Sequence, residues 1–326
     1  MTEPPLELLR RLSDGRFHSG EALATALGLS RAAVWKQVRR LGSLPGIQVD
    51  AVRGRGYRLR EPIEWLESEA VLAHLGETAT LLEGLELLPQ VDSTNARLLA
   101  CEGPAVGRGR ACLAEGQRAG RGRRGRAWFS DFGRNLTLSL AWRFDLPLGA
   151  LSGLSLAAGV ALAEALAALG LSGHGLKWPN DLHLSGRKLA GILVEARGEA
   201  GGPALAVIGI GLNLRLAPDA PIDRPWTDLR SALGETPSRN ACAGVVLRHL
   251  LTACRAYQAH QLSPFLPRWR AYDPYLGREV RVEWAGRRLQ GVYAGLDGGG
   301  RLLLDAAEGR LTLDAGEVSL RPGGGD

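Results

Sequence analysis

The sequence predicts a multidomain α+β protein, with a small helical module first, a larger mixed body next and a small all-β module last. Its 326 residues suffice for about two or more domains. Helical patterns dominate the start of the chain, whereas short strands separated by glycines occupy residues 277–320. Apolar residues make up 45% and charged residues 23%, which is typical of globular proteins and excludes wholesale disorder or a collagen-like chain.

Net charge sets the first module apart from the rest. Residues 1–62 hold 11 Lys or Arg against 6 Asp or Glu, so this segment carries +5 of the chain's total of +6. The remaining residues are therefore almost neutral. A basic excess confined to one module favours nucleic acid as the partner of that module.

The first module also shows the pattern of a helix-turn-helix. Leu6, Leu9 and Leu12 are spaced as on one face of a helix, and two further helical segments follow over residues 21–27 and 31–41. A short glycine-containing turn separates these two segments, and the second has a serine at its N-cap position. A helix, a tight turn and a helix with a cationic face are typical of DNA-binding modules.

Two short strands follow, over residues 47–52 and 57–59, around a basic hairpin tip that resembles the wing of a winged helix. The alternative is a solvated amphipathic helix in a small helical domain. The turn, the hairpin and the localised charge together favour the winged helix-turn-helix. The candidate DNA contacts are Ser30, Arg31, Trp35, Lys36, Arg39, Arg40, Arg53 and Arg55.

Cysteine usage and hydropathy favour a cytoplasmic protein without a membrane segment. The four cysteines have no C-x-x-C spacing, which argues against a disulfide framework or a zinc site. Residues 154–169 are apolar but contain Glu164 and are short for a membrane span, so a buried helix is expected. The start of the chain lacks a basic-then-apolar signal peptide.

A polar quartet opens the central body. Asp92, Ser93, Thr94 and Asn95 stand between an apolar predicted strand and a predicted helix at 96–100. Such residues are typical of a capped helix start. They are equally suited to bind the polar ring of a small ligand.

The most unusual stretch is a Gly/Arg run that contains a literal G-x-G-x-x-G at Gly120, Gly122 and Gly125. A dinucleotide-binding fingerprint requires a helix directly after the glycines, whereas here a strand is predicted over 136–144. We therefore predict a mobile loop whose guanidinium groups suit phosphate oxygens. The alternatives are a basic surface loop or an RNA-binding tract, and Trp128 after the run could simply belong to the core.

Only three of the 40 basic residues are lysines: Lys36, Lys177 and Lys188. Arginine is used almost everywhere else, so each lysine is a candidate for a site that needs a compact ammonium. Lys177 and Lys188 flank Asp181 on neighbouring ends of a predicted strand–hairpin unit. Two cations around one carboxylate suit a reaction that brings two anions together, such as a carboxylate and a phosphate. Taken alone, Asp181 would be interpreted as a turn residue.

The ordered motifs resemble those of the biotin–protein ligases, and more closely the bifunctional bacterial type that also represses the biotin operon. The resemblance covers residues 6–322. The motifs that carry it are Ser93-Thr94-Asn95, the Gly/Arg run at 120–126, Lys-Trp-Pro-Asn-Asp-Leu at 177–182, Gly-Arg-Lys-Leu-Ala-Gly-Ile-Leu-Val-Glu at 186–195 and Gly-Ile-Gly-Leu-Asn-Leu at 209–214.

This resemblance implies three domains. Residues 1–62 would form the winged helix-turn-helix, residues 63–272 a catalytic domain related to class II aminoacyl-tRNA synthetases, and residues 273–326 an SH3-like small β-barrel. Two positions depart from the family pattern. Ala127 replaces the basic residue usual before the tryptophan, and Asp131 stands where proline is common.

The resemblance also implies roles for individual residues. Biotin would be bound by Ser93, Thr94, Asn95, Gln117, Arg121, Gly122, Arg123 and Lys188. ATP or the adenylate would be bound by Arg121, Arg123, Lys177, Asn180, Asn213 and Trp226. The catalytic residues would be Asp181, Lys188 and Arg123. No fixed metal site is implied, and Mg²⁺ would arrive with ATP near Asp181.

The implied function is that of an ATP-dependent, AMP-forming biotin ligase that is also a biotin-responsive repressor. Biotin and ATP would give biotinyl-5′-AMP, from which biotin passes to a lysine of a biotin carboxyl carrier protein. Operator DNA and a second copy of the chain, in a liganded homodimer, would be the other partners. The alternatives are a biotin-sensing repressor without ligase turnover and a ligase for lipoate or another acyl acid.

Overall fold

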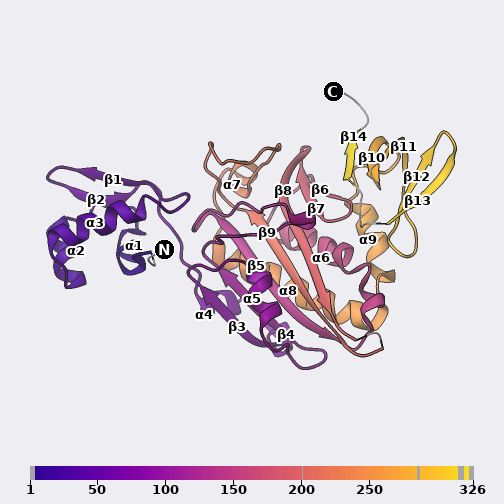
Figure 1. The fold of residues 1–326 in the computed structure, drawn as a ribbon, viewed down its shortest axis with the longest axis horizontal. Coiled ribbons are helices and arrows are strands. Elements are labelled where there is room, and N and C mark those ends of the chain that lie inside the picture. The colour runs from indigo at the N-terminus through magenta and orange to yellow at the C-terminus, as the bar shows by residue number, and fades with distance from the viewer. Residues whose placement is uncertain (1–3, 200, 285–286, 315–318, 323–326) are drawn as a thin grey trace.

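The computed structural model of the chain describes residues 4–199, 201–284, 287–314 and 319–322. Three parts follow one another along the long axis of the molecule (Figure 1). A small helical module with a hairpin lies at one end, a large sheet with helices lies in the middle, and a small β-sheet lies at the other end. The ends of the predicted domains, residues 1–3 and 323–326, lie outside the described residues.

The N-terminal module contains the predicted helices and hairpin. Its elements are α1 (Leu6–Leu12), α2 (Gly20–Leu27), α3 (Arg31–Leu41), β1 (Val49–Val52) and β2 (Gly56–Leu59). Gly28 ends α2 in the left-handed region at φ 63°, and the Ser30 hydroxyl accepts a hydrogen bond from the Ala33 amide at 3.2 Å, which caps α3. Val34, Val38 and Leu41 are buried on the inner face of α3, so the cationic face stays exposed.

The central part is a seven-stranded sheet in the order β3-β4-β5-β9-β8-β7-β6. Only β3 and β4 pair in parallel, and all other neighbours are antiparallel. The strands are β3 (Leu82–Leu88), β4 (Gly109–Ala114), β5 (Asn135–Phe144), β6 (His174–Lys177), β7 (Asp181–Leu184), β8 (Arg187–Arg197) and β9 (Ala204–Asn213). The shorter segments around them are α4 (Ser68–Leu72), α7 (Leu229–Leu233) and α9 (Leu266–Ala271).

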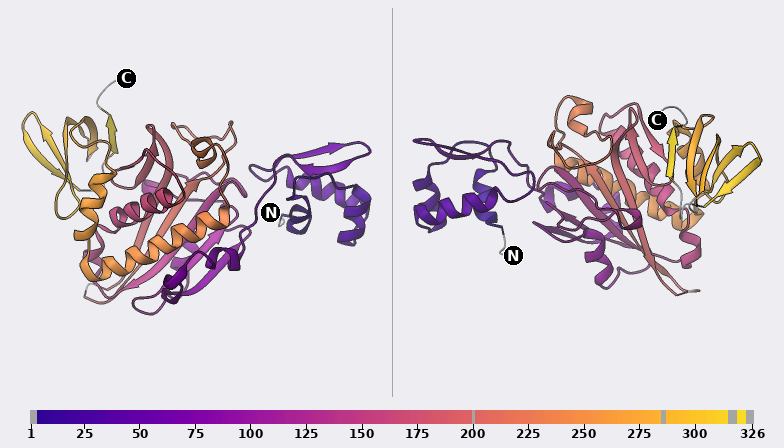
Figure 2. Two further views of the ribbon diagram at one scale, coloured as in Figure 1. Left: turned by 180° about the vertical axis from the view of Figure 1, so that it is seen from behind. Right: turned by 45° about the horizontal axis from the view of Figure 1, so that its top comes forward.

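Strand alternation gives this sheet one apolar face and one mixed face. Along β5, Leu136, Leu138 and Leu140 belong to the large core beneath α6 (Leu154–Ala168) and α8 (Arg239–His260), which lie together on one side (Figure 2). The intervening residues of β5 point to the opposite side, where α5 (Thr94–Ala100) packs. The functional side chains described below lie on the α5 face.

The predicted buried helix is confirmed. Leu148–Ala168 is one described stretch long and apolar enough to cross a membrane, but 72% of its apolar window is buried inside the protein. The sheet covers it on one side and α8 contacts it on another. It therefore forms the core of a globular domain.

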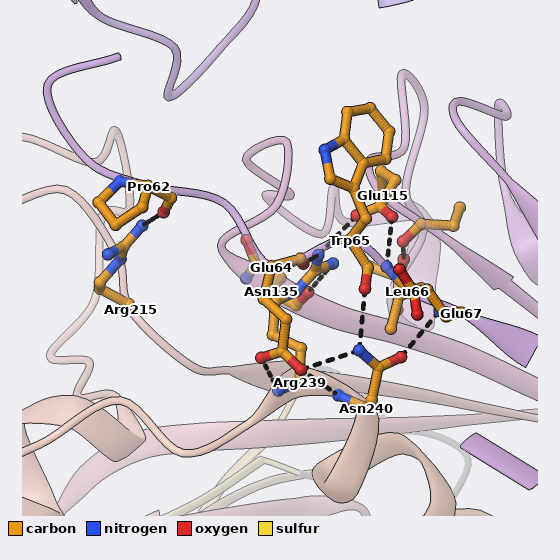
Figure 3. Close-up of polar contacts among 12 residues, drawn as sticks. Pro62, Glu64, Trp65, Leu66, Glu67, Glu115, Asn135, Arg215, Arg239 and Asn240 are labelled. Atoms are coloured by element: carbon orange, nitrogen blue, oxygen red, sulfur yellow. Dashed lines mark hydrogen bonds and ion pairs between the residues drawn. The ribbon is translucent and has the colours of Figure 1, made fainter. Parts of the chain in front are cut away.

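The segment between the two modules is firmly attached rather than loose. The Glu64 carboxylate accepts hydrogen bonds from the Ser238 hydroxyl and the Arg239 amide, both at 2.7 Å. The Leu66 amide donates to Glu115 at 2.8 Å, and the whole cluster is drawn in Figure 3. The domain boundary predicted after residue 62 falls inside this anchored segment.

A turn of the central part reaches back to the N-terminal module. Phe132 joins the core of that module and meets Trp65 edge-to-face at a centroid distance of 5.6 Å. Asp131 beside it is buried against Gly46, and burial raises the pKa of its carboxyl. The position where Asp131 departs from the family pattern is therefore a contact between the two modules.

The C-terminal part is an antiparallel five-stranded sheet in the order β13-β12-β11-β10-β14. The sequence pattern predicts four strands here, over residues 279–284, 289–294, 301–305 and 310–314, and each agrees with a strand of the structure to within two residues at either end, whereas the fifth strand was not predicted. They are β10 (Glu279–Trp284), β11 (Arg287–Leu296), β12 (Leu302–Ala306), β13 (Gly309–Leu313) and β14 (Ser319–Pro322).

Candidate functional site

One row of residues crosses the α5 face of the sheet and holds the centre of the site. Directly paired residues on neighbouring strands point to the same face. Thr137 pairs with Gly211, Gly211 with Gly191, Gly191 with Asp181, and Asp181 with Lys177. Two glycines thus form the middle of the row and a carboxylate–ammonium pair forms its end. This arrangement leaves a shallow backbone floor next to charged groups.

A polar cluster lies at the start of α5, next to that floor. The Thr94 amide and hydroxyl donate to the Gln117 side-chain oxygen at 2.8 and 3.1 Å. The Ser139 hydroxyl lies 2.7 Å from the Thr94 hydroxyl and 2.6 Å from the Asn95 side-chain oxygen. Ser93 caps the helix by accepting from the Ala96 amide at 3.4 Å. The cap interpretation of the quartet is therefore confirmed at Ser93, and the neighbours of Ser93 form a polar network.

Asn95 joins this network to the neighbouring strand. Its amide nitrogen donates to Glu195 at 2.8 Å, and a Cβ atom at Gly209 would overlap its side-chain oxygen. Gly209 is thus required by the close approach of α5 to the sheet. The side chains of Thr94, Asn95 and Gln117, which the sequence proposed for one ligand ring, do lie together.

The Gly/Arg loop folds back on itself over the floor of the site. The Gly122 amide donates to the Arg126 carbonyl at 2.7 Å, and the Trp128 amide donates to the Gly120 carbonyl at 2.8 Å. Between residues 120 and 135 the only helical turn is the short 3₁₀ segment Arg123–Gly125, after which β5 begins. The exclusion of a dinucleotide-binding helix is therefore confirmed.

Two arginines fasten this loop to the sheet. Arg121 forms an ion pair with Glu195 at 3.3 Å, and the Arg123 guanidinium donates to the Asn180 side-chain oxygen at 3.3 Å. Gly122 lies between them and is half-buried. The loop thus connects the polar cluster of α5 with the segment that carries Asp181.

Trp128 is part of the site rather than of the core. A Cβ atom at Gly211 would overlap its indole ring, and one at Gly191 would lie 3.2 Å from it. The two central glycines of the row therefore make room for the ring. The ammonium of Lys188 lies 5.7 Å from the ring centroid, within the range of a cation–π contact.

Lys188 and Asp181 form a short ion pair. The Lys188 Nζ to Asp181 Oδ1 distance is 2.6 Å, and the two side chains are 24% and 23% exposed. Burial acts to raise the pKa of Asp181, but His183 and Lys188 outweigh it and hold the pKa well below its usual range. Asp181 is therefore a carboxylate at all physiological pH values.

The other residues predicted to bind ATP lie around this pair. Lys177 is the direct strand neighbour of Asp181, and Asn180 donates to the Ile192 carbonyl at 2.7 Å. Trp226 forms a backbone bridge with Lys188, and the next carbonyl along, that of Thr227, accepts from Asn213 at 3.0 Å. The residues predicted to bind ATP are thus brought together. The side chain of Asn180, however, forms hydrogen bonds with Arg123 and with the Ile192 carbonyl.

The predicted DNA contacts form a separate surface on α3 and the β1–β2 hairpin. Arg31, Lys36 and Arg39 are exposed on α3, and Arg39 stacks at 5.0 Å from the centroid of Trp35, which is 48% exposed. Ser30 serves as the N-cap. The remaining members of the surface are Arg40, Arg53 and Arg55, all exposed.

Sequence reasoning missed several residues of the site, among them Ser139, His183, Glu195, Gly209 and Gly211. The glycines had a visible signal, because glycine inside a predicted strand indicates close approach of another group. The other three had none, because each depends on strand pairing with distant segments.

No group of three or more His, Cys, Asp or Glu side chains is placed to hold a metal ion among the described residues. Asp181 is the carboxylate nearest the lysines. A single carboxylate beside a phosphate site fits Mg²⁺, which proteins usually hold through one or two carboxylates and the substrate's phosphates.

Three family models match the chain. The biotin/lipoate A/B protein ligase family matches residues 87–213, a helix-turn-helix (HTH) domain matches residues 6–58, and the biotin protein ligase C-terminal domain matches residues 275–321. Together they span all three parts of the fold.

The similar proteins agree with these matches. The bifunctional ligase/repressor BirA of Escherichia coli (strain K12) is 41% identical over 319 residues, which is 97% of each chain. The biotin–[acetyl-CoA-carboxylase] ligase of Mycobacterium tuberculosis is 36% identical over 80% of this chain and 97% of its own. The solved biotin protein ligase from Aquifex aeolicus in complex with biotin and ATP has a TM-score of 0.63 at 28% identity, covering 74% of this chain and 99% of that one.

Proposed function

Because the chain belongs to the bifunctional ligase/repressor family of biotin protein ligases, we propose that it joins biotin to a protein lysine at the expense of ATP and represses transcription through its N-terminal module. We further propose that biotinyl-5′-AMP is the intermediate and that a biotin carboxyl carrier protein is the acceptor. The relatives with biotin in their names disfavour lipoate as the acid.

One observation carries the catalytic part of this proposal. The Lys177–Asp181–Lys188 group lies at one edge of a glycine floor, across that floor from the Thr94–Asn95 network and near the Gly/Arg loop. A ligand ring in the polar network would direct a carboxylate chain across the floor toward the lysines. Phosphate groups would then meet that carboxylate between the two ammonium groups.

In the first step a biotin carboxylate oxygen attacks the α-phosphorus of ATP, forming the mixed anhydride and releasing pyrophosphate. Lys188 holds the carboxylate, while Lys177 neutralises phosphate charge. Gln117, Thr94 and Asn95 orient the ring, Trp226 packs near the adenine base, and Asn213 contacts the adenylate. In the second step the acceptor amine attacks the anhydride carbonyl, forming an amide and releasing AMP.

Asp181 would hold Mg²⁺ that arrives with ATP, and this ion would share the phosphate charge. The carboxylate also fixes the resting position of Lys188. The Gly/Arg loop, tied down through Arg121 and Arg123, excludes water from the hydrolysable anhydride.

The decisive experiment is to incubate the full chain with biotin and ATP labelled at the α-phosphate, without acceptor. We expect one labelled adenylate to stay bound to each protein molecule. Lipoate in place of biotin should give none. Absence of labelled product with biotin would contradict ligase function and leave the sensing-only alternative.

We predict that Arg123→Gly releases the adenylate. This substitution removes the contact to Asn180 and adds backbone freedom, so the loop should open more often. The variant should label lysines of a bystander protein such as albumin, whereas the parent should not. Arg124→Gly is the matched control, because Arg124 is exposed and, within the part of the chain that the structure describes, has no hydrogen bond or ion pair to the sheet segment of Asp181. Equal retention of adenylate by the parent and Arg123→Gly would refute the proposed lid.

We predict that residues 1–62 carry the DNA affinity. Operator binding by the full chain should weaken steeply with salt, because Lys and Arg contacts to phosphates release counterions, with log K falling at about −0.9 per contact against log salt. A chain that begins at residue 63 should lose specific binding yet still form adenylate. Specific binding by this shortened chain would contradict the assignment.

We also propose a cytoplasmic location and a homodimer in the liganded state. Cys101, Cys112, Cys242 and Cys254 are all free thiols, which fits a reducing compartment. Helix-turn-helix repressors bind paired half-sites as two-fold dimers, so DNA binding by this module favours dimerisation.

A further inference from the structure

A buried histidine lies beside the catalytic carboxylate, and adenylation as proposed gives it no role. His183 follows Asp181 by two residues on β7, so both side chains point to the same face. His183 is only 9% exposed, and neither of its ring nitrogens has a hydrogen-bond partner within the described ranges. Buried polar groups nearly always have a partner, so an orphaned ring at this place requires an explanation.

The surroundings of His183 shield the ring from solvent. Its direct neighbours are Gly175 on β6 and Lys188 on β8. A Cβ atom at Gly175 would lie 2.9 Å from Pro274, so the segment leading to the C-terminal sheet covers this face. The ring is thus enclosed, with Asp181 as its nearest charged neighbour on the same strand.

The two oxygens of Asp181 face different groups. Oδ1 lies 2.6 Å from the ammonium of Lys188, whereas Oδ2 lies 3.9 Å from Nε2 of His183. The second distance exceeds a hydrogen bond by about 1 Å, which a small rotation of the ring can close. Oδ1 is therefore already paired with Lys188, and Nε2 of His183 is the donor closest to hydrogen-bond distance of Oδ2 on this side.

We propose that His183 is a positioning residue that donates a hydrogen bond from Nε2 to Oδ2 of Asp181 when Lys188 moves to the biotin carboxylate. This inference rests on the proposed function. Lys188 cannot give its full charge to both carboxylates, so Asp181 loses its closest partner as biotin binds. A largely buried carboxylate that loses a donor is destabilised, and its plane can then rotate more easily. The histidine keeps the plane of this carboxylate fixed, so that Asp181 would remain available to hold the Mg²⁺ that arrives with ATP.

The test is single-turnover adenylate formation by the full chain. His183→Phe keeps the ring and removes the donor, and we expect a rate about tenfold lower, which corresponds to about 1.4 kcal/mol in the barrier. The dissociation constants of biotin and ATP should change by less than about threefold. His183→Gln, whose amide also donates, should restore most of the rate. His183→Met provides a second donor-free side chain if the Phe variant does not fold.

A matched control separates catalysis from folding. His174 is a second buried histidine on the neighbouring strand, and its Nε2 bonds to the Ala163 carbonyl at 2.8 Å. His174→Phe should lower the melting temperature but leave the adenylation rate close to that of the parent. A rate loss equal to that of His183→Phe would show that disturbing the sheet is sufficient, and would overturn the inference.

The coupling to Asp181 is tested in the Asp181→Asn background. There His183→Phe should add little further loss, because the two residues act as one unit. If the rate losses of His183→Phe and Asp181→Asn multiply in the double variant, the inference is overturned. It is also overturned if both His183→Phe and His183→Met keep the parental rate, or if His183→Gln is as slow as His183→Phe. A parental rate for Asp181→Asn alone would overturn the catalytic assignment of Asp181, and this inference with it. A slow Asp181→Asn with a parental His183→Phe would overturn the inference alone.

Discussion

Lys188→Ala is expected to weaken biotin binding by about 30-fold or more and to abolish measurable adenylate synthesis. Removing one partner of a partly desolvated charge pair costs on the order of 2–5 kcal/mol, and 2 kcal/mol corresponds to about a 30-fold change in affinity. The same ammonium neutralises Asp181 before biotin binds, so the substitution leaves both carboxylates without this cation. ATP binding, which we propose depends mainly on Lys177 and Asn180, should change less. Calorimetric titration with each substrate measures both effects.

Lys188→Arg should also impair adenylate formation and slow it at least about tenfold. An increase of only about 1.4 kcal/mol in the activation barrier is sufficient for this. An ammonium contacts one carboxylate oxygen and leaves the other free to attack phosphorus, whereas a guanidinium clamps both. The structure adds a steric reason. A Cβ atom at Gly191 would lie 3.2 Å from the Lys188 ammonium, and the ammonium lies 5.7 Å from the centroid of the Trp128 ring. Because the space around the ammonium is this narrow, a bulkier head group must displace the loop.

The control for both lysine variants is Arg187→Ala. Arg187 precedes Lys188 on β8, is exposed and points to the other side of the strand. Its loss should leave the single-turnover rate unchanged. Parental rates for Lys188→Arg would reduce Lys188 to a generic cation, and parental biotin affinity for Lys188→Ala would remove it from the biotin site.

Local patterns explain why the N-terminal module was predictable. Helical spacing, the cap at Ser30 and the glycine turn at Gly28 all act within a few residues, and α3 begins and ends as predicted. The C-terminal strands were equally visible because glycine turns separate them. The lack of a helix after the Gly/Arg run also followed from local spacing, and the structure confirms it.

The arrangement of the site was less accessible, because the sheet joins segments far apart in the chain. Thr137, Gly211, Gly191 and Asp181 form one row only because β5, β9, β8 and β7 are neighbours in that order. Nothing in a single strand reveals this order. The role of Trp128 could not be predicted for the same reason, because the space for its ring is provided by two glycines on different strands.

The attachment of the linker was invisible in the sequence. Residues 61–67 looked like a simple boundary between modules, yet they carry a polar cluster whose partners are about 50 to 175 positions away. The cluster centres on Arg239 and Glu115, which come from α8 and the end of β4 (Figure 3). Two charged residues so far apart in sequence give no signal of pairing.

Arg239→Met is accordingly expected to destabilise the protein strongly, by about 3–5 kcal/mol. Arg239 and Glu115 side chains are only 3% and 5% exposed and lie 2.6 Å apart. The guanidinium also donates to the Glu64 carbonyl at 2.5 Å and to the Asn135 carbonyl at 3.3 Å. Removing it leaves a buried carboxylate with the Leu66 amide as its remaining described donor. A melting temperature lower by about 6–20 °C should result.

Charge, rather than lost packing, is the predicted cause, and a second substitution distinguishes the two. Arg239→Met with Glu115→Gln removes the unpaired charge and keeps an oxygen for the Leu66 amide, so it should recover most of the melting temperature. Arg310→Ala is the matched control, because its 2.7 Å ion pair with Asp305 is exposed to solvent and its loss should be barely measurable. A double variant as unstable as Arg239→Met would refute the electrostatic explanation. An effect of Arg310→Ala equal to that of Arg239→Met would show that burial does not decide the strength of these pairs.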